Sequence, residues 1–290
     1  MIGTARTTAA ITIVNGLPTG FGCALGVALP VRARVVLEPA PAGQEPSLRF
    51  SRGAATPVVR ETLRLAIDRY AAGGPWNADL HLRSEIPPAR GLKSSSAVAT
   101  AVALATARAA GREPPDLEIA RLAAGAARTS GISATGAFDD AIAGLRSGFC
   151  LANNRTDELV RHGPVDPRWR VSLLVPGGRH LPSPEWKRAF ERRAADSTRA
   201  VDAALEGRWW EAMAINSELV EEVVGYAYAT LRADLASRGA LGSGVSGLGP
   251  AFAAISEPPH EAEVLGAMPK ERGTVRALSV ATEADREDRS

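Results

Sequence analysis

The chain of 290 residues has little cysteine, little histidine and almost no net charge. Its two cysteines, Cys23 and Cys150, are far apart and lack metal-type spacing, and the four histidines are dispersed. This usage disfavours a disulfide framework and a zinc site, and it indicates a reducing compartment. A net charge of +2 gives no reason to expect binding to nucleic acid or to an anionic membrane surface.

The sequence also lacks a hydrophobic run long enough to cross a membrane. The longest run of small apolar residues, 97–107, is well short of the roughly 20 residues that a span needs. No signal peptide is evident, because the apolar run at 9–14 is short and follows many polar residues. We therefore expect a cytoplasmic protein, monomeric or homodimeric, whose partners are small molecules and neither nucleic acid nor membrane.

The chain is organised around the stretch from Ile86 to Ala97, which reads I-P-P-A-R-G-L-K-S-S-S-A. Two prolines stop the preceding strand-like run, and Gly91 permits a close backbone approach or a positive φ. Three serines then stand where a helix should begin, the position at which a side-chain oxygen can satisfy free N–H groups. A helix start with a glycine before it and Lys93 beside it is suited to bind an anion, so we predict a phosphate loop. An ordinary capped helix is the alternative. The stretch is not a Walker A loop, because the second glycine of that pattern is missing.

Three further segments carry candidate chemistry. The segment 129–141, T-S-G-I-S-A-T-G-A-F-D-D-A, places Asp139 and Asp140 before an apolar run, where they could also merely cap a helix. Segment 15–26 is rich in glycine and is expected to be a loop. Segment 242–255, G-S-G-V-S-G-L-G-P-A-F-A-A-I, predicts a glycine-rich turn that enters a strand.

These segments resemble the motifs of the GHMP kinases (galactokinase, homoserine kinase, mevalonate kinase and relatives), and the K-S-S-S form resembles the archaeal shikimate kinases in particular. The resemblance covers nearly the whole chain. It implies ATP-dependent phosphorylation of a shikimate hydroxyl to give shikimate 3-phosphate and ADP, with ATP and Mg²⁺ as cofactors. It also implies an α+β fold with two lobes, an N-terminal lobe like the second domain of ribosomal protein S5 and a ferredoxin-like C-terminal lobe.

The resemblance further implies roles for particular residues. Asp139 would be the catalytic base, and Ser95 would contact the metal. The active-site glycine loop would contain Gly244, Ser246, Gly247 and Gly249. The residues that would bind ATP and its phosphates are Pro87, Pro88, Ala89, Arg90, Gly91, Leu92, Lys93, Ser94, Ser95, Ser96 and Ala97.

Two positions depart from the family pattern. Phe21 stands where many members have lysine, and no acid occurs near Ala126, where some members have a magnesium-binding glutamate. These departures keep open a non-catalytic relative that binds a ligand. A GHMP kinase for another small alcohol, such as homoserine or mevalonate, is a second alternative, which differs only in its acceptor.

The remaining pattern alternates strands and helices. We expect strands over 9–14, 27–37, 47–50, 78–86, 171–175 and 274–280, and helices over 58–72, 94–110, 184–205 and 209–238. Alternation places Arg32 and Arg34 on one face of their strand and His81 and Arg83 outward on theirs. A polar span from Arg155 to Trp169 marks the expected boundary between domains 1–160 and 161–290, both of α+β character.

Overall fold

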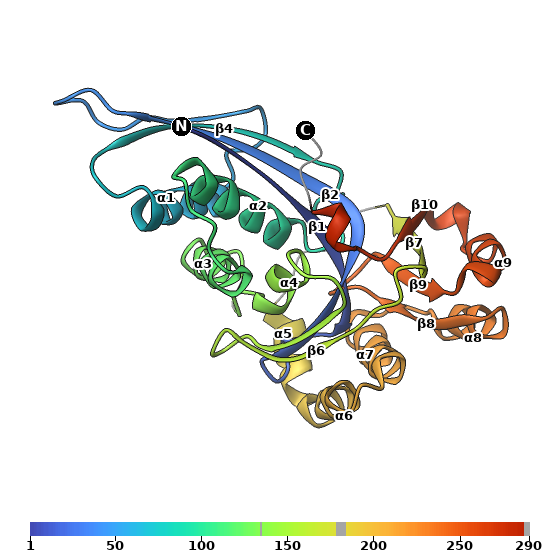
Figure 1. The fold of residues 1–290 in the computed structure, drawn as a ribbon. Helices are drawn as coiled ribbons and strands as arrows, with labels where there is room; N and C mark the ends of the chain where they lie inside the picture. Colours follow the sequence, from blue (N-terminus) through green and yellow to red (C-terminus); the bar gives the residue numbers. More distant parts are fainter. Residues whose placement is uncertain (134, 178–183, 287–290) are drawn as a thin grey trace.

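The first lobe is built on two long strands, in a computed structural model that describes residues 1–133, 135–177 and 184–286 (Figure 1). Strand β1 (Ile2–Val14) pairs antiparallel with β2 (Phe21–Pro39). The sheet continues in the order β3-β4-β2-β5-β6, with β3 (Leu48–Phe50), β4 (Trp76–Ser84), β5 (Phe149–Asn153) and β6 (Glu158–Gly163). Apolar side chains that alternate along these strands, such as Ile11 and Leu25, are fully buried.

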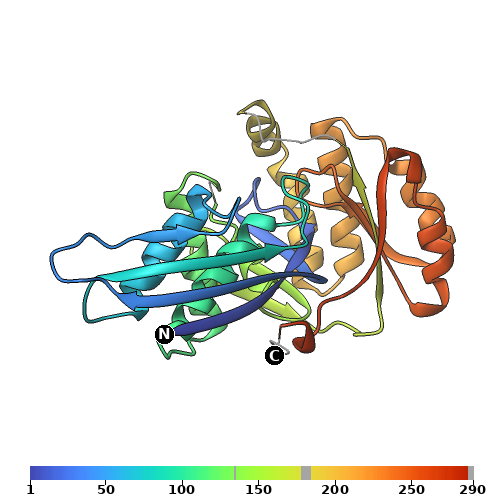
Figure 2. The same cartoon turned by 90° about the horizontal axis from the view of Figure 1, so that it is seen from above.

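Helices cover one face of this sheet. They are α1 (Pro57–Tyr70), α2 (Ser94–Ala109), α3 (Asp116–Thr129) and α4 (Phe138–Ala143). The alanine-rich α2 packs directly on β1 and β2, and its small side chains allow a close approach: a Cβ on Gly3 would lie 2.2 Å from the Ala105 carbonyl oxygen. Figure 2 shows that no helix covers the opposite face of β1, β2 and β4 in their outer part.

The second lobe is a four-stranded antiparallel sheet in the order β10-β7-β9-β8. The strands are β7 (Arg170–Pro176), β8 (Ala240–Val245), β9 (Phe252–Ser256) and β10 (Gly273–Ser279). Helices α5 (Pro184–Arg192), α6 (Ala194–Leu205), α7 (Trp209–Val224) and α8 (Ala229–Ser237) connect β7 to β8, and α9 (Glu261–Gly266) connects β9 to β10. This order is ferredoxin-like, so the expected α+β class and the expected C-terminal architecture are confirmed.

Several expected boundaries differ from the structure. Strand β2 begins at Phe21, so the glycine-rich loop ends earlier than expected. The helix expected over 209–238 is two helices, because Gly225 takes the left-handed conformation (φ 92°) that ends α7. The helix expected over 184–205 divides at Arg193. The domain boundary at 160/161 stays a prediction; strand β6 spans it and pairs with β5 as far as Gly163.

The two lobes meet around a cluster of aromatic side chains. The Phe149 ring of the first sheet stacks on Trp209 of α7 with 4.6 Å between centroids, and Trp169 and Trp210 meet it edge-on. These rings join both lobes in one apolar core. Among the helices that the structure describes, none is long and apolar enough to cross a membrane.

Candidate active site

Helix α2 begins with free backbone N–H groups. Lys93 is the residue before the helix and adopts the left-handed conformation (φ 61°, ψ 29°), and the three serines occupy the first three helical positions. No side chain caps the helix, so the expectation that a serine oxygen satisfies these N–H groups is wrong. In the described part of the chain, the backbone N–H groups of residues 91–96 donate no hydrogen bond. A helix start with six unpartnered N–H groups is suited to bind an anion.

The glycine-rich turn of the second lobe holds this loop in place. Ser246 Oγ donates a hydrogen bond to the Gly91 carbonyl oxygen (2.7 Å), and the Ala251 N–H donates one to the Arg90 carbonyl oxygen (3.1 Å). Gly91 has φ 82°, and a Cβ there would lie 2.0 Å from the Ser246 carbonyl oxygen. Gly91 therefore allows the two loops to touch, which a larger residue would prevent.

Helix α4 places two carboxyl groups opposite the loop. Ala137, in the left-handed conformation (φ 52°), turns the chain into α4, and Asp139 and Asp140 follow with 4% and 7% exposed surface. The Asp139 N–H donates to Asn154 Oδ1 (3.0 Å). A Cβ on Gly22 would lie 2.3 Å from Asp139 Oδ2, so this glycine of β2 makes room for the carboxylate.

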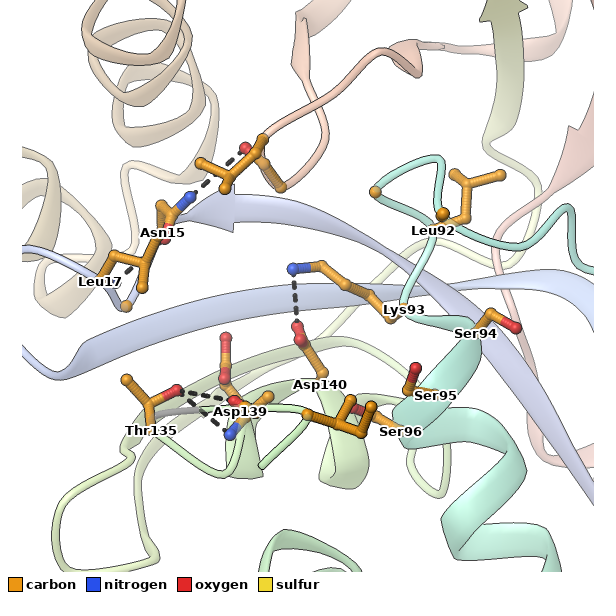
Figure 3. A pocket seen from close by; sticks show the side chains of 18 of the residues that line it. Asn15, Leu17, Leu92, Lys93, Ser94, Ser95, Ser96, Thr135, Asp139 and Asp140 are labelled. Atoms are coloured by element: carbon orange, nitrogen blue, oxygen red, sulfur yellow. Dashed lines mark hydrogen bonds and ion pairs between the residues drawn. The ribbon is translucent and has the colours of Figure 1, made fainter. Parts of the chain in front are cut away.

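The two carboxyl groups differ in their electrostatic surroundings. Lys93 Nζ lies 3.1 Å from Asp140 Oδ1, an ion pair between the loop and α4 (Figure 3). Burial, and after it the Asp140 charge, raise the pKa of Asp139 to about 7, while Lys93 and Asn154 oppose the rise. Burial also raises the pKa of Asp140, against the lowering effect of Lys93. Asp140 is thus held in an ion pair by Lys93, whereas Asp139 is a group that can take up a proton near neutral pH.

Both lobes line a hollow of about 280 Å³ between the loop and α4 (Figure 3). Of the predicted site residues, the structure brings together here Ala89, Arg90, Gly91, Leu92, Lys93, Ser94, Ser95, Ser96, Asp139, Gly247 and Gly249. Pro87, Pro88, Ala97, Gly244 and Ser246 lie outside the lining. Gly244 is in β8, where a Cβ would lie 2.9 Å from Ser217 Cβ, and Ser246 is buried and binds Thr12 and Gly91.

The hollow also contains residues that were not assigned to the site from the sequence. Asn154, which comes after β5, positions Asp139, and Asn15 at the end of β1 donates through Nδ2 to the Gly247 carbonyl oxygen (3.3 Å). Thr135 and Ser133 line the side formed by the segment before α4, whose Ala134 lies outside the described residues. The glycine-rich segment pointed to Asn15, but nothing local in the sequence marks Asn154.

The two departures from the family pattern lie outside the hollow. Phe21 stands at the start of β2, and Ala126 is fully buried in α3. The cationic residues in the described lining are Lys93, which pairs with Asp140, and Arg90, whose buried Nη1 has no hydrogen-bond partner. Among the residues that the structure describes, no group of three or more His, Cys, Asp or Glu side chains is placed so that it could hold a metal ion.

Comparison with known proteins agrees with this geometry. The family description "GHMP kinases N terminal domain" matches residues 58–148. The shikimate kinase of Pyrococcus abyssi is 33% identical over 264 residues, which are 90% of this chain and 94% of that protein. The shikimate kinase of Halobacterium salinarum is 32% identical, with 95% and 96% covered, and that of Thermococcus kodakarensis is 35% identical, with 89% and 93% covered.

Solved structures show the same fold at much lower identity. A homoserine kinase from Cytophaga hutchinsonii superposes with a TM-score of 0.73 at 16% identity, covering 98% of this chain and 97% of that one. The mevalonate kinase of Methanococcus jannaschii gives 0.69 at 14% identity, covering 97% and 98%. At such identities the similarity concerns the fold alone.

Proposed function

Because the chain belongs to the GHMP kinase family, and is similar to archaeal shikimate kinases along most of its length, we propose that it transfers the γ-phosphoryl group of ATP to a hydroxyl of shikimate, giving shikimate 3-phosphate and ADP. One observation carries the proposal on the structural side. Six free N–H groups, a lysine and a buried carboxyl pair meet in one hollow. This combination suits phosphoryl transfer, which depends on positioning and on neutralising charge.

The loop at the start of α2 fits the phosphates of ATP. The N–H groups of residues 91–96 would donate to phosphate oxygens, and the positive end of the helix favours the negative charge. Lys93 reaches across the hollow to Asp140 and adds a positive charge between the loop and α4. Lys93 and Ala137 are not glycines, yet they take left-handed conformations just before α2 and α4. Such backbone strain is concentrated at functional positions.

Arg90 is our candidate for the cation that replaces the family lysine missing at Phe21. It lines the hollow next to Gly91, and its Nη1 is buried without an acceptor. A buried donor without a partner is costly, and an incoming phosphate or carboxylate oxygen would satisfy it.

The residues present also fit Mg²⁺ as a partner of the nucleotide. When bound, Mg²⁺ neutralises charge on the phosphates, and it keeps water ligands readily, so it needs few protein ligands. The hydroxyl of Ser95 faces the hollow and makes no hydrogen bond in the described structure, so Ser95 would be the protein contact. No acid near Ala126 is required for this arrangement.

Asp139 would accept the proton of the attacking hydroxyl. Its carboxyl is held by burial against Gly22 and by the bond from its own N–H to Asn154, so it has little freedom to turn away. A pKa of about 7 places its proton affinity near the working pH, where general-base catalysis is most effective. Asp140 would keep Lys93 in place without taking part in proton transfer.

ADP release with Mg-ATP tests the proposal, with shikimate, homoserine, mevalonate or no acceptor. We expect turnover with shikimate alone, and one phosphorylated product by ³¹P NMR. Turnover with another acceptor would keep the kinase chemistry and refute the substrate. ATP binding without turnover on any acceptor would favour the non-catalytic alternative.

A further inference from the structure

The uncovered face of the first sheet carries arginines from three neighbouring strands in register. Arg6 of β1 lies opposite Arg32 of β2, and Arg32 lies opposite Arg83 of β4. Two residues along, Thr4, Arg34 and His81 form the next row. Residues two apart in a strand point to the same face, so these six residues form one surface, which we call the arginine face.

Among the described residues, the acids beside the arginine face, Asp79 and Glu85, form no ion pair with its arginines. In the described structure, Arg6, Arg32, Arg34 and Arg83 form no ion pair, although arginines elsewhere, such as Arg64, Arg128 and Arg232, are paired with acids. The nearby acid Asp79 is already shared by Arg49 and His81. Like charges directly opposite each other destabilise a sheet, so the arrangement costs stability in the free protein.

The shape of the arginine face suits a compact ligand. Five of its six residues, all but Arg6, together with Ala33, line a hollow of about 400 Å³. Neighbouring strands are about 4.8 Å apart and the two rows about 6.7 Å apart, so the cationic groups lie within the size of a small molecule. The Nε of the half-buried Arg6 has no hydrogen-bond partner. No helix lies over this face of the three strands (Figure 2).

We propose that the arginine face binds a small organic anion that carries at least two phosphate or carboxylate groups. Arginine recognises both groups through paired N–H donors, and bound anions remove the repulsion between the opposed guanidinium groups. The site is separate from the proposed active site: Asn15 comes nine positions after Arg6, at the far end of β1, a distance of about 30 Å along an extended strand. With a net charge of only +2, the chain as a whole has no excess of positive charge to attract a long polyanion.

Calorimetric titration with sodium tripolyphosphate, without Mg²⁺ and at low salt, tests this site. The phosphate loop can also bind the probe, so we expect two sites on the wild-type protein. The double variant Arg32→Gln/Arg34→Gln should lose one site or weaken it at least tenfold, and should keep its turnover and KM for ATP. Arg112→Gln/Arg199→Gln removes the same charge from exposed arginines elsewhere and should keep both sites.

Thermal unfolding gives a second readout. Tripolyphosphate should raise the Tm of the wild type more than that of the Arg32/Arg34 variant, and Arg83→Gln alone should show part of the same loss. Equal binding by wild type and the Arg32/Arg34 variant would overturn the proposal, and so would equal weakening in the Arg112/Arg199 control. Tighter binding of a single-stranded 20-nucleotide DNA than of tripolyphosphate at the arginine face would overturn the small-anion assignment.

Discussion

Replacing Asp139 by asparagine should impair catalysis and stabilise the protein at the same time. Asparagine keeps the shape of the side chain and removes the charge that burial makes costly. The backbone bond from residue 139 to Asn154 is unaffected, because it is donated by the main chain. We expect kcat to fall by about 10² or more, the scale of a lost general base, with ATP binding largely unchanged.

The gain in stability depends on pH in a defined direction. The pKa of Asp139 is raised from 3.8 to about 7, so between these values the native state holds a proton that the unfolded state has released. This carboxyl therefore lowers the stability of the wild type as pH rises through that window, and the loss is complete above it. At 1.36 kcal/mol per pKa unit, the cost to the wild type is about 2 kcal/mol at pH 5 and about 4 kcal/mol at pH 8.

Thermal unfolding at the two pH values measures this cost. With about 2 °C per kcal/mol for a chain of this size, Asp139→Asn should raise Tm by roughly 4 °C at pH 5 and 8 °C at pH 8. Asp140→Asn is the matched comparison: burial raises the pKa of Asp140 as well, but its ion pair with Lys93 opposes the rise, so this variant should raise Tm by less than Asp139→Asn does. A Tm for Asp139→Asn at or below that of the wild type at pH 8 would refute the burial argument. A kcat within tenfold of the wild type would remove Asp139 from the role of base.

Three further predictions follow from particular contacts. Gly22→Ala places a Cβ against the Asp139 carboxylate and should lower kcat at least tenfold, whereas Gly125→Ala, in open space on α3, should leave kcat unchanged; equal kcat for the two variants would contradict the close approach. Lys93→Met should raise the KM for ATP at least tenfold, measured by initial rates, and an unchanged KM would place the lysine outside phosphate binding. Glu221→Ala removes the buried partner of Arg232 (2.9 Å), leaving it only the exposed Glu218, and also removes the acceptor for Ser217 Oγ and the Tyr228 N–H, so it should cost about 3 kcal/mol in urea unfolding; a loss below about 1 kcal/mol would show that these contacts are dispensable.

The start of α2 shows what local sequence patterns can predict and what they cannot. Proline, glycine and serine marked the loop correctly, because turn and helix-start preferences depend on a few neighbouring residues. The helix begins at Ser94 as expected, but the role given to the serines was wrong: the residue before the helix is a left-handed Lys93, and no side chain caps the free N–H groups. The conformation of Lys93 is set by contacts with the second lobe and α4, which no local pattern contains.

Asn154 and the arginine face are features that depend on the three-dimensional structure and could not be predicted from local sequence. The alternation of β2 correctly placed Arg32 and Arg34 on one face, and that of β4 correctly placed His81 and Arg83 outward. Their alignment in rows depends on strand register, which is fixed by pairing between residues far apart in the sequence. In the same way Asn154 follows β5 without any motif, and only the pairing of β5 with β2 brings it beside Asp139.

The glycine-rich turn after β8 contributes to the proposed site in two ways, and the sequence motif alone does not distinguish them. Gly247 and Gly249 line the hollow, whereas Ser246 lies behind it. Ser246 accepts a bond from the Thr12 N–H of β1 and donates one to Gly91, and the Gly247 N–H donates to Thr12 Oγ1. The turn thus ties β1 of the first lobe to the phosphate loop. Because phosphoryl transfer depends on holding nucleotide and acceptor in a fixed geometry, we expect the hydrogen bonds behind the hollow to contribute to the proposed reaction together with the residues that line it.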